Sequence, residues 1–329
     1  MTQDGGPSLL PEGPLLAVHA HPDDETLSTG ALLAAWAHRG QPVTVVTCTR
    51  GERGEVIDTA HHRTGLARLE GDPRALAAHR EHEVATALAA LGVSDHAFLD
   101  TVPAGPPVSR FEDSGMQWVA PGVAGPGADA PATALSRVPL DDAAVRLAAV
   151  LRDRRPAVVV SYEPRGGYGH PDHVRTYEVT VRAVALAADP AAPVAGEPWL
   201  VPERWEAVAP EAEVRAARRA LAADAEARAL AHDVGLSFPD PDESLPPVAK
   251  DDAGLAGAAT VRVAVAPVLE PLLAAMRGHA TQVQHATRAA ADGEPRDGIL
   301  GWYALSNDVL APVLAHETYV RHAPVGSPR

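Results

Sequence analysis

Short apolar runs alternate with longer segments of helical spacing along the first 190 positions of the chain. Leu15–Val18 and Gln41–Thr49 are rich in aliphatic and β-branched residues, a composition that favours buried strands. Between them, the apolar residues of Leu27–Arg39 recur at helical spacing, and Gly40 follows, a residue typical of helix ends. A strand–helix–strand unit of this length predicts a right-handed crossover between two parallel strands.

The alternation continues with predicted strands at Asp95–Leu99 and Ala157–Tyr162 and predicted helices at Arg74–Leu91, Leu140–Arg154 and 174–188. Such alternation is typical of a fold in which helices cover both faces of a parallel sheet. We therefore expect an α/β protein with a mostly parallel sheet between layers of helices. Asp100–Pro139 is rich in Pro and Gly and is expected to be a long loop that carries binding residues.

The pattern is less regular after the Pro- and Ala-rich segment Asp189–Pro198. The elements predicted there are strands at Arg204–Val208 and Ala259–Val265 and helices at Pro210–Asp233, Pro267–Gln284 and Gly301–Tyr319. This change predicts a catalytic domain over residues 1–190 and a smaller α/β portion over residues 191–329 that closes the substrate site. Residues 1–13 are polar and are predicted to form a loose tail.

Composition narrows the class of protein. The chain has 28 Lys and Arg against 43 Asp and Glu, a net charge of −15, which argues against nucleic acid or an anionic membrane as partner. The single cysteine, Cys48, excludes a disulfide framework and fits a reducing cytoplasm. The N-terminus does not resemble a signal peptide, and no apolar run reaches the roughly 18 residues of a membrane span. We expect a cytoplasmic protein that acts on a small molecule, and the sequence does not indicate its oligomeric state.

Polar side chains crowd the junction between the first strand and the first helix. His19, His21, Asp23 and Asp24 lie within six positions, and Pro22 stiffens the turn between them. A strand-to-helix turn needs one capping residue, so two histidines and two aspartates favour a functional site. In open α/β sheets, ligands bind where strands end and helices begin.

A second cluster follows the strand at Ala157–Tyr162 in the same way. Its members that can hold a proton or a metal are Tyr168, His170, Asp172 and His173. Both clusters follow strands of one parallel sheet, so we expect them on the same edge of that sheet. This convergence favours a metal site over two ordinary capped turns.

A divalent cation held by His21, Asp24 and His173 would have two imidazoles and one carboxylate, a ligand set common in zinc hydrolases. Such a cation makes water a stronger acid and polarises a carbonyl group. Asp23, a carboxylate beside these ligands, is then free to act as general base.

The other members of the second cluster are expected to assist. His170 can protonate a leaving group or stabilise an oxyanion, with Asp172 fixing its orientation. Tyr168 can donate a hydrogen bond to the substrate carbonyl. Two alternatives stay open: Tyr168 packs under the loop, or Asp172 caps the helix that follows.

The remaining histidines favour structural roles. His19 lies on the opposite face of its strand from Val18 and is interpreted as buried structure. His79 and His82 are three apart on a predicted helix, where a solvated face is favoured over a metal site. The sequence has no HExxH motif, and no P-loop or GxGxxG where a nucleotide site would need one.

With both clusters in view, the chain resembles the LmbE-like, or PIG-L, family of zinc-dependent deacetylases. Ala20–Glu25 and His170–His173 carry this resemblance, in the order and separation of the family's two-part signature. The resemblance is strong over residues 15–190 and patchy beyond. A closer similarity, to the mycothiol-pathway members that deacetylate an N-acetylglucosaminyl inositol, rests on Val18–Ser28, Val45–Thr49, Gly54–Ile57, Asp113–Met116, Gly166–His173 and Trp302–Asn307.

The resemblance implies a Rossmann-like sandwich with a smaller C-terminal portion, and one zinc ion per subunit, with ferrous iron as the alternative. It implies an amino-sugar inositol as the small-molecule substrate. The family's metal ligands fall on His21, Asp24 and His173, and its general base falls on Asp23. The residues that stabilise the tetrahedral intermediate fall on His170 and Tyr168. Its substrate contacts fall on Ser28, Arg80, Asp113 and Met116.

Three functions fit this pattern, and the rim of the substrate site separates them. Segment 121–135, Arg50 and Arg53 depart from the family pattern, which leaves that rim open. The first function is hydrolysis of an N-acetyl sugar amide. The second is cleavage of a larger amide by a mycothiol S-conjugate amidase, in which the resemblance implies a proline in place of Gly169 and a basic residue near Ser28. The third, a metal-dependent sugar-binding protein without catalysis, is disfavoured by the free Asp23.

Overall fold

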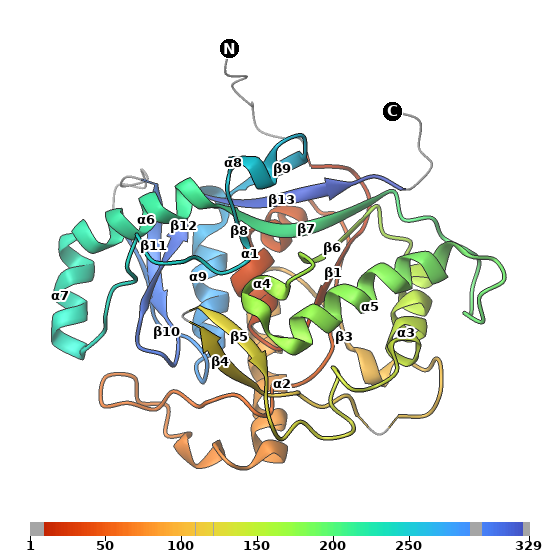
Figure 1. The fold of residues 1–329 in the computed structure, drawn as a ribbon, viewed down its shortest axis with the longest axis horizontal. Helices are drawn as coiled ribbons and strands as arrows, with labels where there is room; N and C mark the ends of the chain where they lie inside the picture. The colour runs from red at the N-terminus through yellow and green to blue at the C-terminus, as the bar shows by residue number, and fades with distance from the viewer. Residues whose placement is uncertain (1–9, 109, 121, 290–297, 325–329) are drawn as a thin grey trace.

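One eight-stranded sheet passes through the centre of the computed structural model, which describes residues 10–108, 110–120, 122–289 and 298–324 (Figure 1). Seven strands follow one another across it in the order β3 (Asp95–Phe98), β2 (Val43–Thr47), β1 (Leu15–His19), β6 (Val158–Tyr162), β7 (Glu203–Pro210), β13 (His316–His322) and β9 (Ala259–Ala264), and β8 (Ala249–Lys250) pairs with the end of β7. The first five strands of this order are parallel, and β13 is antiparallel to both of its neighbours. The predicted α/β fold with a mostly parallel sheet is confirmed.

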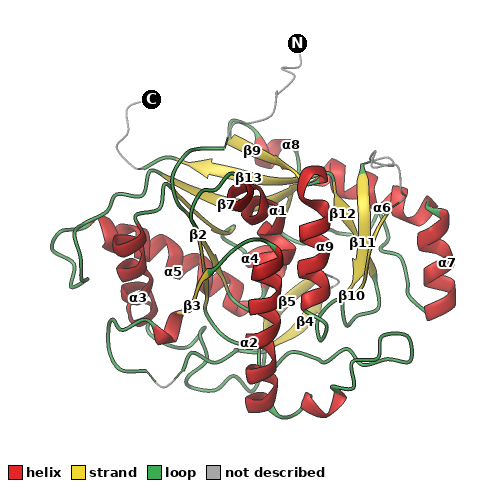
Figure 2. Ribbon diagram, turned by 180° about the vertical axis from the view of Figure 1, so that it is seen from behind, coloured by secondary structure: helices red, strands yellow, loops and turns green. Residues whose placement is uncertain are grey.

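Helices cover both faces of the sheet (Figure 2). One face packs against α1 (Asp24–His38), α2 (Pro73–Ala90) and α9 (Leu269–Gly278), and the other against α3 (Leu140–Arg154) and α5 (Pro171–Ala188). Along β1, Leu15 and Ala17 belong to the first core, while Leu16 and Val18 belong to the second. Side chains alternate between the faces of a strand, so a strand buried on both sides has a continuous apolar sequence.

Two helices begin one turn earlier than their apolar spacing predicts. α1 starts at Asp24 rather than Leu27, and α5 starts at Pro171 rather than Val174. Acidic residues and proline are favoured in the first turn of a helix, where they add no apolar signal. Both polar clusters therefore lie at helix N-termini on the carboxyl edge of the sheet.

The sheet does not end at residue 190. β7 pairs in parallel with β6, and β13 and β9 extend the sheet beyond β7. The two predicted portions therefore share one sheet. The division at residue 190 stays a prediction: residues 1–190 carry the metal ligands, and residues 191–329 close the substrate site.

The helix predicted at Gly301–Tyr319 is wrong. This stretch forms β11 (Ile299–Ala304), β12 (Leu310–Leu314) and part of β13, and β11 pairs on its other side with β10 (Gln284–Arg288). The reason is the tight turn before β12, in which Asp308 has a φ of 55°. Asn and Asp tolerate this left-handed conformation, which reverses the chain between two strands.

Two further helix predictions are wrong in their extent. Pro210–Asp233 is divided into α6 (Glu211–Ala223) and α7 (Ala225–Val234), because Asp224 accepts two N–H groups and caps a new helix. The helix predicted at Pro267–Gln284 begins with a 3₁₀ turn and ends at Gly278.

The long predicted loop at Asp100–Pro139 contains a small hairpin of β4 (Met116–Ala120) and β5 (Val123–Pro126). The remaining short elements are α4 (Gly166–Gly169), α8 (Asp252–Leu255) and 3₁₀ turns at Ala67–Leu69, Leu99–Thr101 and Ala266–Val268. Most of the predicted N-terminal tail, residues 1–9, lies outside the described residues, as does position 121 of segment 121–135.

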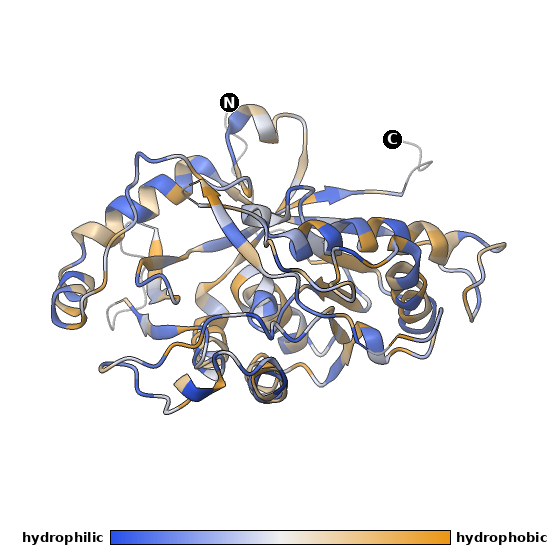
Figure 3. Cartoon of the chain, turned by 60° about the horizontal axis from the view of Figure 1, so that its bottom comes forward, coloured by the Kyte–Doolittle hydropathy of each residue, from blue (hydrophilic) through white to orange (hydrophobic). Residues whose placement is uncertain are grey.

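Hydrophilic and hydrophobic residues are mixed along the helices (Figure 3). Among the described residues, no helix is both long enough and apolar enough to span a membrane.

Candidate metal centre

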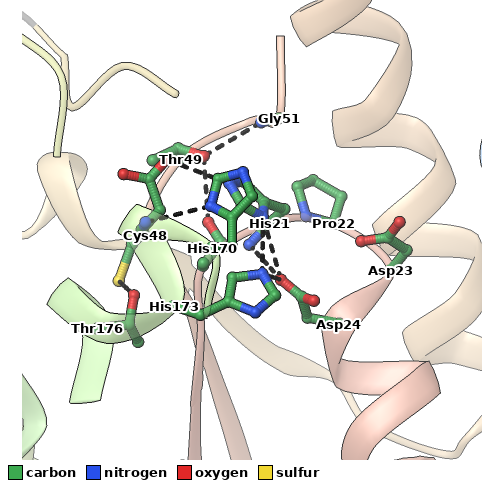
Figure 4. A network of polar contacts seen from close by, with 12 residues as sticks. His21, Pro22, Asp23, Asp24, Cys48, Thr49, Gly51, His170, His173 and Thr176 are labelled. Carbon is green, nitrogen blue, oxygen red and sulfur yellow. Dashed lines mark hydrogen bonds and ion pairs between the residues drawn. The ribbon is translucent and has the colours of Figure 1, made fainter. Parts of the chain in front are cut away.

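Three side chains from the two clusters meet at the carboxyl edge of the sheet (Figure 4). His21 Nδ1 and His173 Nε2 each lie 3.3 Å from Asp24 Oδ2, and the two nitrogens lie 3.3 Å apart. Ligand atoms placed about 2.0–2.1 Å from a tetrahedral zinc ion are separated by about 3.3 Å. These three atoms, here called the ligand triangle, therefore have the spacing of ligands to one such cation.

Each imidazole presents a lone pair to the ligand triangle, because its other nitrogen has a partner elsewhere. His21 Nε2 lies 3.3 Å from Asp172 Oδ2, and His173 Nδ1 lies 3.2 Å from the carbonyl oxygen of Gly166. Both partners are acceptors, which assigns the ring hydrogens to these outer nitrogens. Two bare nitrogens and a carboxylate oxygen repel one another at 3.3 Å, so the ligand triangle fits a cation at its centre.

The electrostatics of the site favour positive charge at the same point. Burial opposes protonation of His21, yet Asp113, Asp172 and Asp24 together hold the pKa of His21 well above its ordinary value. Burial also opposes ionisation of Asp24, while His173 and His21 hold the pKa of Asp24 well below its ordinary value. A site that attracts a proton in this way also supplies negative charge for a divalent cation.

Two other groups of possible ligands overlap this one within the described residues. In both, the donor atoms lie within 4.8 Å of one another, and the groups are His21, His170 and His173, and His21, Asp113, His170 and Asp172. Both include His170, whose Nδ1 already accepts the backbone N–H of Asp172 at 3.1 Å. The ligand triangle is tighter and does not use His170, so it is the better candidate.

Asp23 lies beside the ligand triangle and is not one of its members (Figure 4). Its Oδ2 lies 3.3 Å from Arg80 Nη2. Burial raises the pKa of Asp23 to about 6, although the charge of Arg80 opposes this. Its φ of 114° is rare for any residue except glycine and costs about 1–3 kcal/mol. The predicted general base is thus a strained, partly buried carboxylate next to the ligands.

Asp172 contacts two histidines, His170 through its backbone N–H at 3.1 Å and His21 through its carboxylate at 3.3 Å. Its carboxylate accepts the N–H of Ser114 at 2.8 Å and the Ser114 hydroxyl, and it faces His21 rather than His170. The reason is that α5 starts at Pro171, which places Asp172 inside the helix and makes His170 the capping residue. Asp172 therefore fixes the orientation of a candidate ligand, in a carboxylate–histidine–metal arrangement.

Tyr168 lies over the second cluster. The centroid of its ring is 5.0 Å from that of His173, 6.0 Å from that of His170 and 5.8 Å from that of Trp118. Burial raises the pKa of Tyr168 well above its ordinary value, so the hydroxyl keeps its hydrogen and can donate it. Tyr168 can therefore both pack against the second cluster and donate a hydrogen bond to a substrate.

Two cavities adjoin the ligand triangle. The first has a volume of about 370 Å³ and mostly polar lining residues, among them His21, Asp23, Asp24, Tyr168 and His170. The predicted substrate contacts Arg80, Asp113 and Met116 also line it. The C-terminal portion contributes Leu305, Ser306 and Asn307. The second, of about 390 Å³, has mainly apolar walls and shares Asp24, Tyr168, Leu27 and Leu305 with the first. Ser28, the fourth predicted contact, lines only this second cavity.

The other predicted contacts are held in place by the protein itself. Arg80 donates through Nη1 to the carbonyl of Gly51 at 2.7 Å and through Nη2 to the carbonyl of Pro22. Asp113 accepts the N–H groups of Gly115 at 2.8 Å and Arg53 at 3.2 Å. Their roles toward a substrate stay predictions.

Among the other histidines, His19 is fully buried, its Nε2 lies 3.0 Å from Thr29 Oγ1, and burial lowers its pKa to about 4. The prediction that His19 is buried is confirmed. His82 is exposed on α2, as expected for a solvated helix face, whereas His79 is half-buried and its Nε2 lies 3.5 Å from the buried carboxylate of Glu83.

Sequence reasoning missed three residues that support the site: Ser114, Glu25 and His279. Ser114 and Glu25 lie directly beside residues that were predicted as site residues. Which side chain each of them binds in the folded protein cannot be inferred from the motif. His279 lies 254 positions from Glu25, to which it is hydrogen-bonded. No local pattern indicates that contact.

Comparison with known proteins identifies relatives of the whole chain. The family model described as PIG-L, GlcNAc-PI de-N-acetylase, matches residues 16–184. A 1D-myo-inositol 2-acetamido-2-deoxy-alpha-D-glucopyranoside deacetylase of Kineococcus radiotolerans is 44% identical, with 95% of this chain and 79% of the relative aligned. A protein of the same name from Streptomyces avermitilis is 40% identical, over 97% and 96% of the two chains.

Solved structures show a shared fold. GalB, the 4-carboxy-2-hydroxymuconate hydratase of Pseudomonas putida KT2440, matches with a TM-score of 0.50 at 16% identity, over 96% of this chain and 99% of that chain. A hydratase on this fold means that the fold alone does not define the reaction, which has to be argued from the site.

Proposed function

This chain belongs to the PIG-L family, and on that premise we propose that it is a zinc-dependent deacetylase of 1D-myo-inositol 2-acetamido-2-deoxy-alpha-D-glucopyranoside in mycothiol biosynthesis. The observation that carries the proposal is the ligand triangle with the separate carboxylate of Asp23 beside it in one polar cavity. As part of the proposal, the enzyme acts in the cytoplasm on a small molecule. Ferrous iron is the alternative metal.

His21, Asp24 and His173 would hold the cation, which supplies Lewis acidity by polarising the amide carbonyl and making water a stronger acid. Asp23 accepts the proton of the attacking water. Its raised pKa, about 6, suits a group that must take up a proton near neutral pH and release it again.

His170 faces the same cavity as a hydrogen-bond donor. Its Nδ1 accepts the N–H of Asp172, so its own hydrogen lies on Nε2. Burial, together with His21 and His173, lowers the pKa of His170 well below its ordinary value. A neutral imidazole of this kind stabilises an oxyanion by hydrogen bonding, which favours that role over proton donation to the leaving group.

The substrate assignment draws on the names of the relatives and on the cavity. A volume of about 370 Å³ and walls that carry both charges suit a small polyhydroxylated molecule. Arg80 and Asp113 are proposed to bind inositol or sugar hydroxyls by charge-assisted hydrogen bonds, with Met116 and Ser28 at the rim. Gly169 has a φ of 91°, which proline cannot adopt, and this disfavours the amidase-type loop.

One observation favours the conjugate amidase as a second candidate. The apolar cavity of about 390 Å³ reaches Asp24 and His173 and has room for an acyl group larger than acetyl. The two candidates differ in the amide that is cut and share the metal centre.

Side-by-side kinetics on three amides test the proposal. The expected kcat/KM is highest for the N-acetylglucosaminyl inositol, lower for free N-acetylglucosamine and lower for a mycothiol conjugate, with all activity lost in the presence of a chelator. Equal rates on the free sugar would refute the inositol-specific assignment. Faster cleavage of the conjugate would favour the amidase, and full activity without metal would remove the metal centre from the mechanism.

A further inference from the structure

Behind Asp23 lies a buried ion pair that the proposed mechanism does not use. Glu25 Oε1 lies 2.7 Å from His279 Nε2, and both side chains are fully buried. His279 follows the end of α9, in the C-terminal portion, whereas Glu25 lies in the first turn of α1. Replacing a buried ion pair by apolar side chains often costs nothing in stability, so such a pair is weak evidence of a stabilising role.

The pair acts on the backbone of Asp23. The second carboxylate oxygen of Glu25, Oε2, accepts the backbone N–H of Asp23 at 3.0 Å. Asp23 is the N-cap residue of α1 and has a φ of 114°, and its own side chain makes no capping hydrogen bond. The carboxylate of Glu25 therefore holds the peptide of Asp23 in a conformation that this residue avoids when it is unconstrained.

His279 and Thr26 fix the rotation of that carboxylate. Both contact Oε1, His279 at 2.7 Å and the Thr26 hydroxyl at 2.5 Å, which leaves Oε2 directed at the N–H of Asp23. Without the imidazole, the carboxylate loses its strongest partner on that side and can turn away from Asp23.

The turn that follows His279 is anchored to α2, the helix that also contacts Asp23. Thr281 donates through its N–H and its hydroxyl to Glu83, at 2.7 Å in each case. Glu83 lies one turn beyond Arg80, whose Nη2 lies 3.3 Å from the carboxylate of Asp23. Asp23 is thus held between Arg80 on its side chain and the Glu25–His279 pair on its backbone.

We propose that His279, acting through Glu25, is a positioning residue that holds Asp23 at the working distance from the ligand triangle. The inference rests on the proposed function, because it assumes that Asp23 is the general base. A displacement of about 1 Å in a catalytic group can lower a rate by about 100-fold. Loss of the pair should therefore lower kcat and leave KM and metal content unchanged.

Three substitutions at His279 test the proposal. His279→Gln places an amide N–H within reach of Glu25 and should keep at least about half of kcat. His279→Asn is too short, and His279→Leu has no donor, so both should lower kcat about 10–100-fold, with KM within about twofold and stoichiometric metal. Using two deficient variants keeps the test valid if His279→Leu does not fold. Leu273→Ala, a fully buried residue on α9 away from both cavities, is the control for lost stability, and it should keep its kcat below its melting temperature.

A double-mutant cycle separates positioning from a general structural role. If His279 acts through Asp23, His279→Asn should slow the wild-type enzyme but have no further effect in the Asp23→Asn background. Additive losses, unchanged kcat in all three variants, or loss of metal would overturn the proposal. A slow Asp23→Asn enzyme with a normal His279→Asn enzyme would overturn only this inference. Full activity of Asp23→Asn would overturn both this inference and the assignment of the base.

Discussion

The two strand-to-helix turns that form the metal centre are held in different ways. In the first turn, the positive φ falls on Asp23, which is held by Arg80 of α2 and by Glu25 of α1, and Glu25 is bound in turn by His279 after α9. In the second turn, the positive φ values fall on Gly166, Gly167 and Gly169, and His170 of the turn itself caps the helix. Glycine adopts these angles without strain.

The difference shows two ways to place ligands at the edge of one sheet. The second turn is encoded mainly by its own glycines and by His170, although the N–H of Val248 also binds the carbonyl of Gly167 at 2.8 Å. The first turn is strained and depends on long-range contacts, so its shape depends on the packing of the whole protein. Substitutions in the two turns should therefore differ in whether they reduce metal binding, activity or stability.

Removing the ligand supplied by the second turn should have the largest effect. His173→Ala leaves His21 and Asp24 as the only ligands in the triangle, and a site reduced to two ligands should lose its metal and its activity. Metal analysis of the purified variant and an assay of acetate release measure both. His82→Ala, an exposed histidine on α2, is the matched control and should keep both. Stoichiometric metal at unchanged affinity in His173→Ala would remove His173 from the ligand set.

In the first turn, Asp23→Asn should keep the metal and lose activity roughly 10²–10⁴-fold, the usual contribution of a positioned general base. The amide cannot accept the proton, while the ligand triangle does not contain Asp23. Metal content and kcat of the same preparation decide the result. If the variant loses its metal, the roles assigned to Asp23 and Asp24 are exchanged.

The local encoding of the second turn can be tested with two glycines. In Gly166→Ala the new Cβ would lie 2.6 Å from the backbone nitrogen of Val174 and 2.7 Å from His173 Cβ, whereas Gly235, at the end of α7, has no atom within 4 Å of the equivalent position. Gly235→Ala should lower the free energy of unfolding by about 1–2 kcal/mol, the cost of a left-handed alanine. Gly166→Ala should lower it further and also weaken metal binding. Urea unfolding and metal titration measure the two effects, and equal losses would contradict the prediction.

The dependence of the first helix on distant contacts should appear as a pH effect. Glu317 of β13 accepts the N–H groups of Ala31 and Leu32 in α1, at 2.8 Å each, and burial raises the pKa of Glu317 to about 7 from an ordinary value of 4.5. The folded protein therefore keeps this proton longer than the unfolded chain does. Its contribution to stability is present below pH 4.5 and is lost as the pH rises to 7, by about 3 kcal/mol or less.

Unfolding free energies at several pH values between 4.5 and 8 check this effect. The Glu317→Gln variant has no titrating group at this position, so the difference between wild type and variant should change with pH and then become constant above about pH 7. A constant difference over the whole range would show that the carboxyl group of Glu317 has the same pKa in both states.

The elements that position the ligands could be predicted because their signals are local. The apolar runs at β1 and β6 and the polar residues after them identify two strands of one parallel sheet, and the sheet rules place both turns on one edge. His21, Asp24 and His173 are close together in the structure for this reason. The first turns of α1 and α5 escaped prediction because polar N-terminal residues carry no apolar periodicity.

The C-terminal portion was predicted poorly because its structure depends on contacts and turns. An Ala-rich sequence favours a helix at Pro210–Asp233 without showing the break that Asp224 causes. The turn before β12 outweighs the helical spacing at Gly301–Tyr319. The contact of His279 with Glu25, and the alignment of Asp172 with His21, join segments more than 150 positions apart and have no local signal.

The place of β6 in the sheet has a consequence for truncated forms of this protein. The match to the family model ends at residue 184, and a fragment cut there would leave β6 as the last strand of the sheet. All five residues of β6 are buried in the full chain, where β7 satisfies one side of the strand. The fragment would expose a flat apolar edge with unpaired N–H and C=O groups, the kind of edge that recruits other chains. We expect such a fragment to aggregate rather than fold on its own.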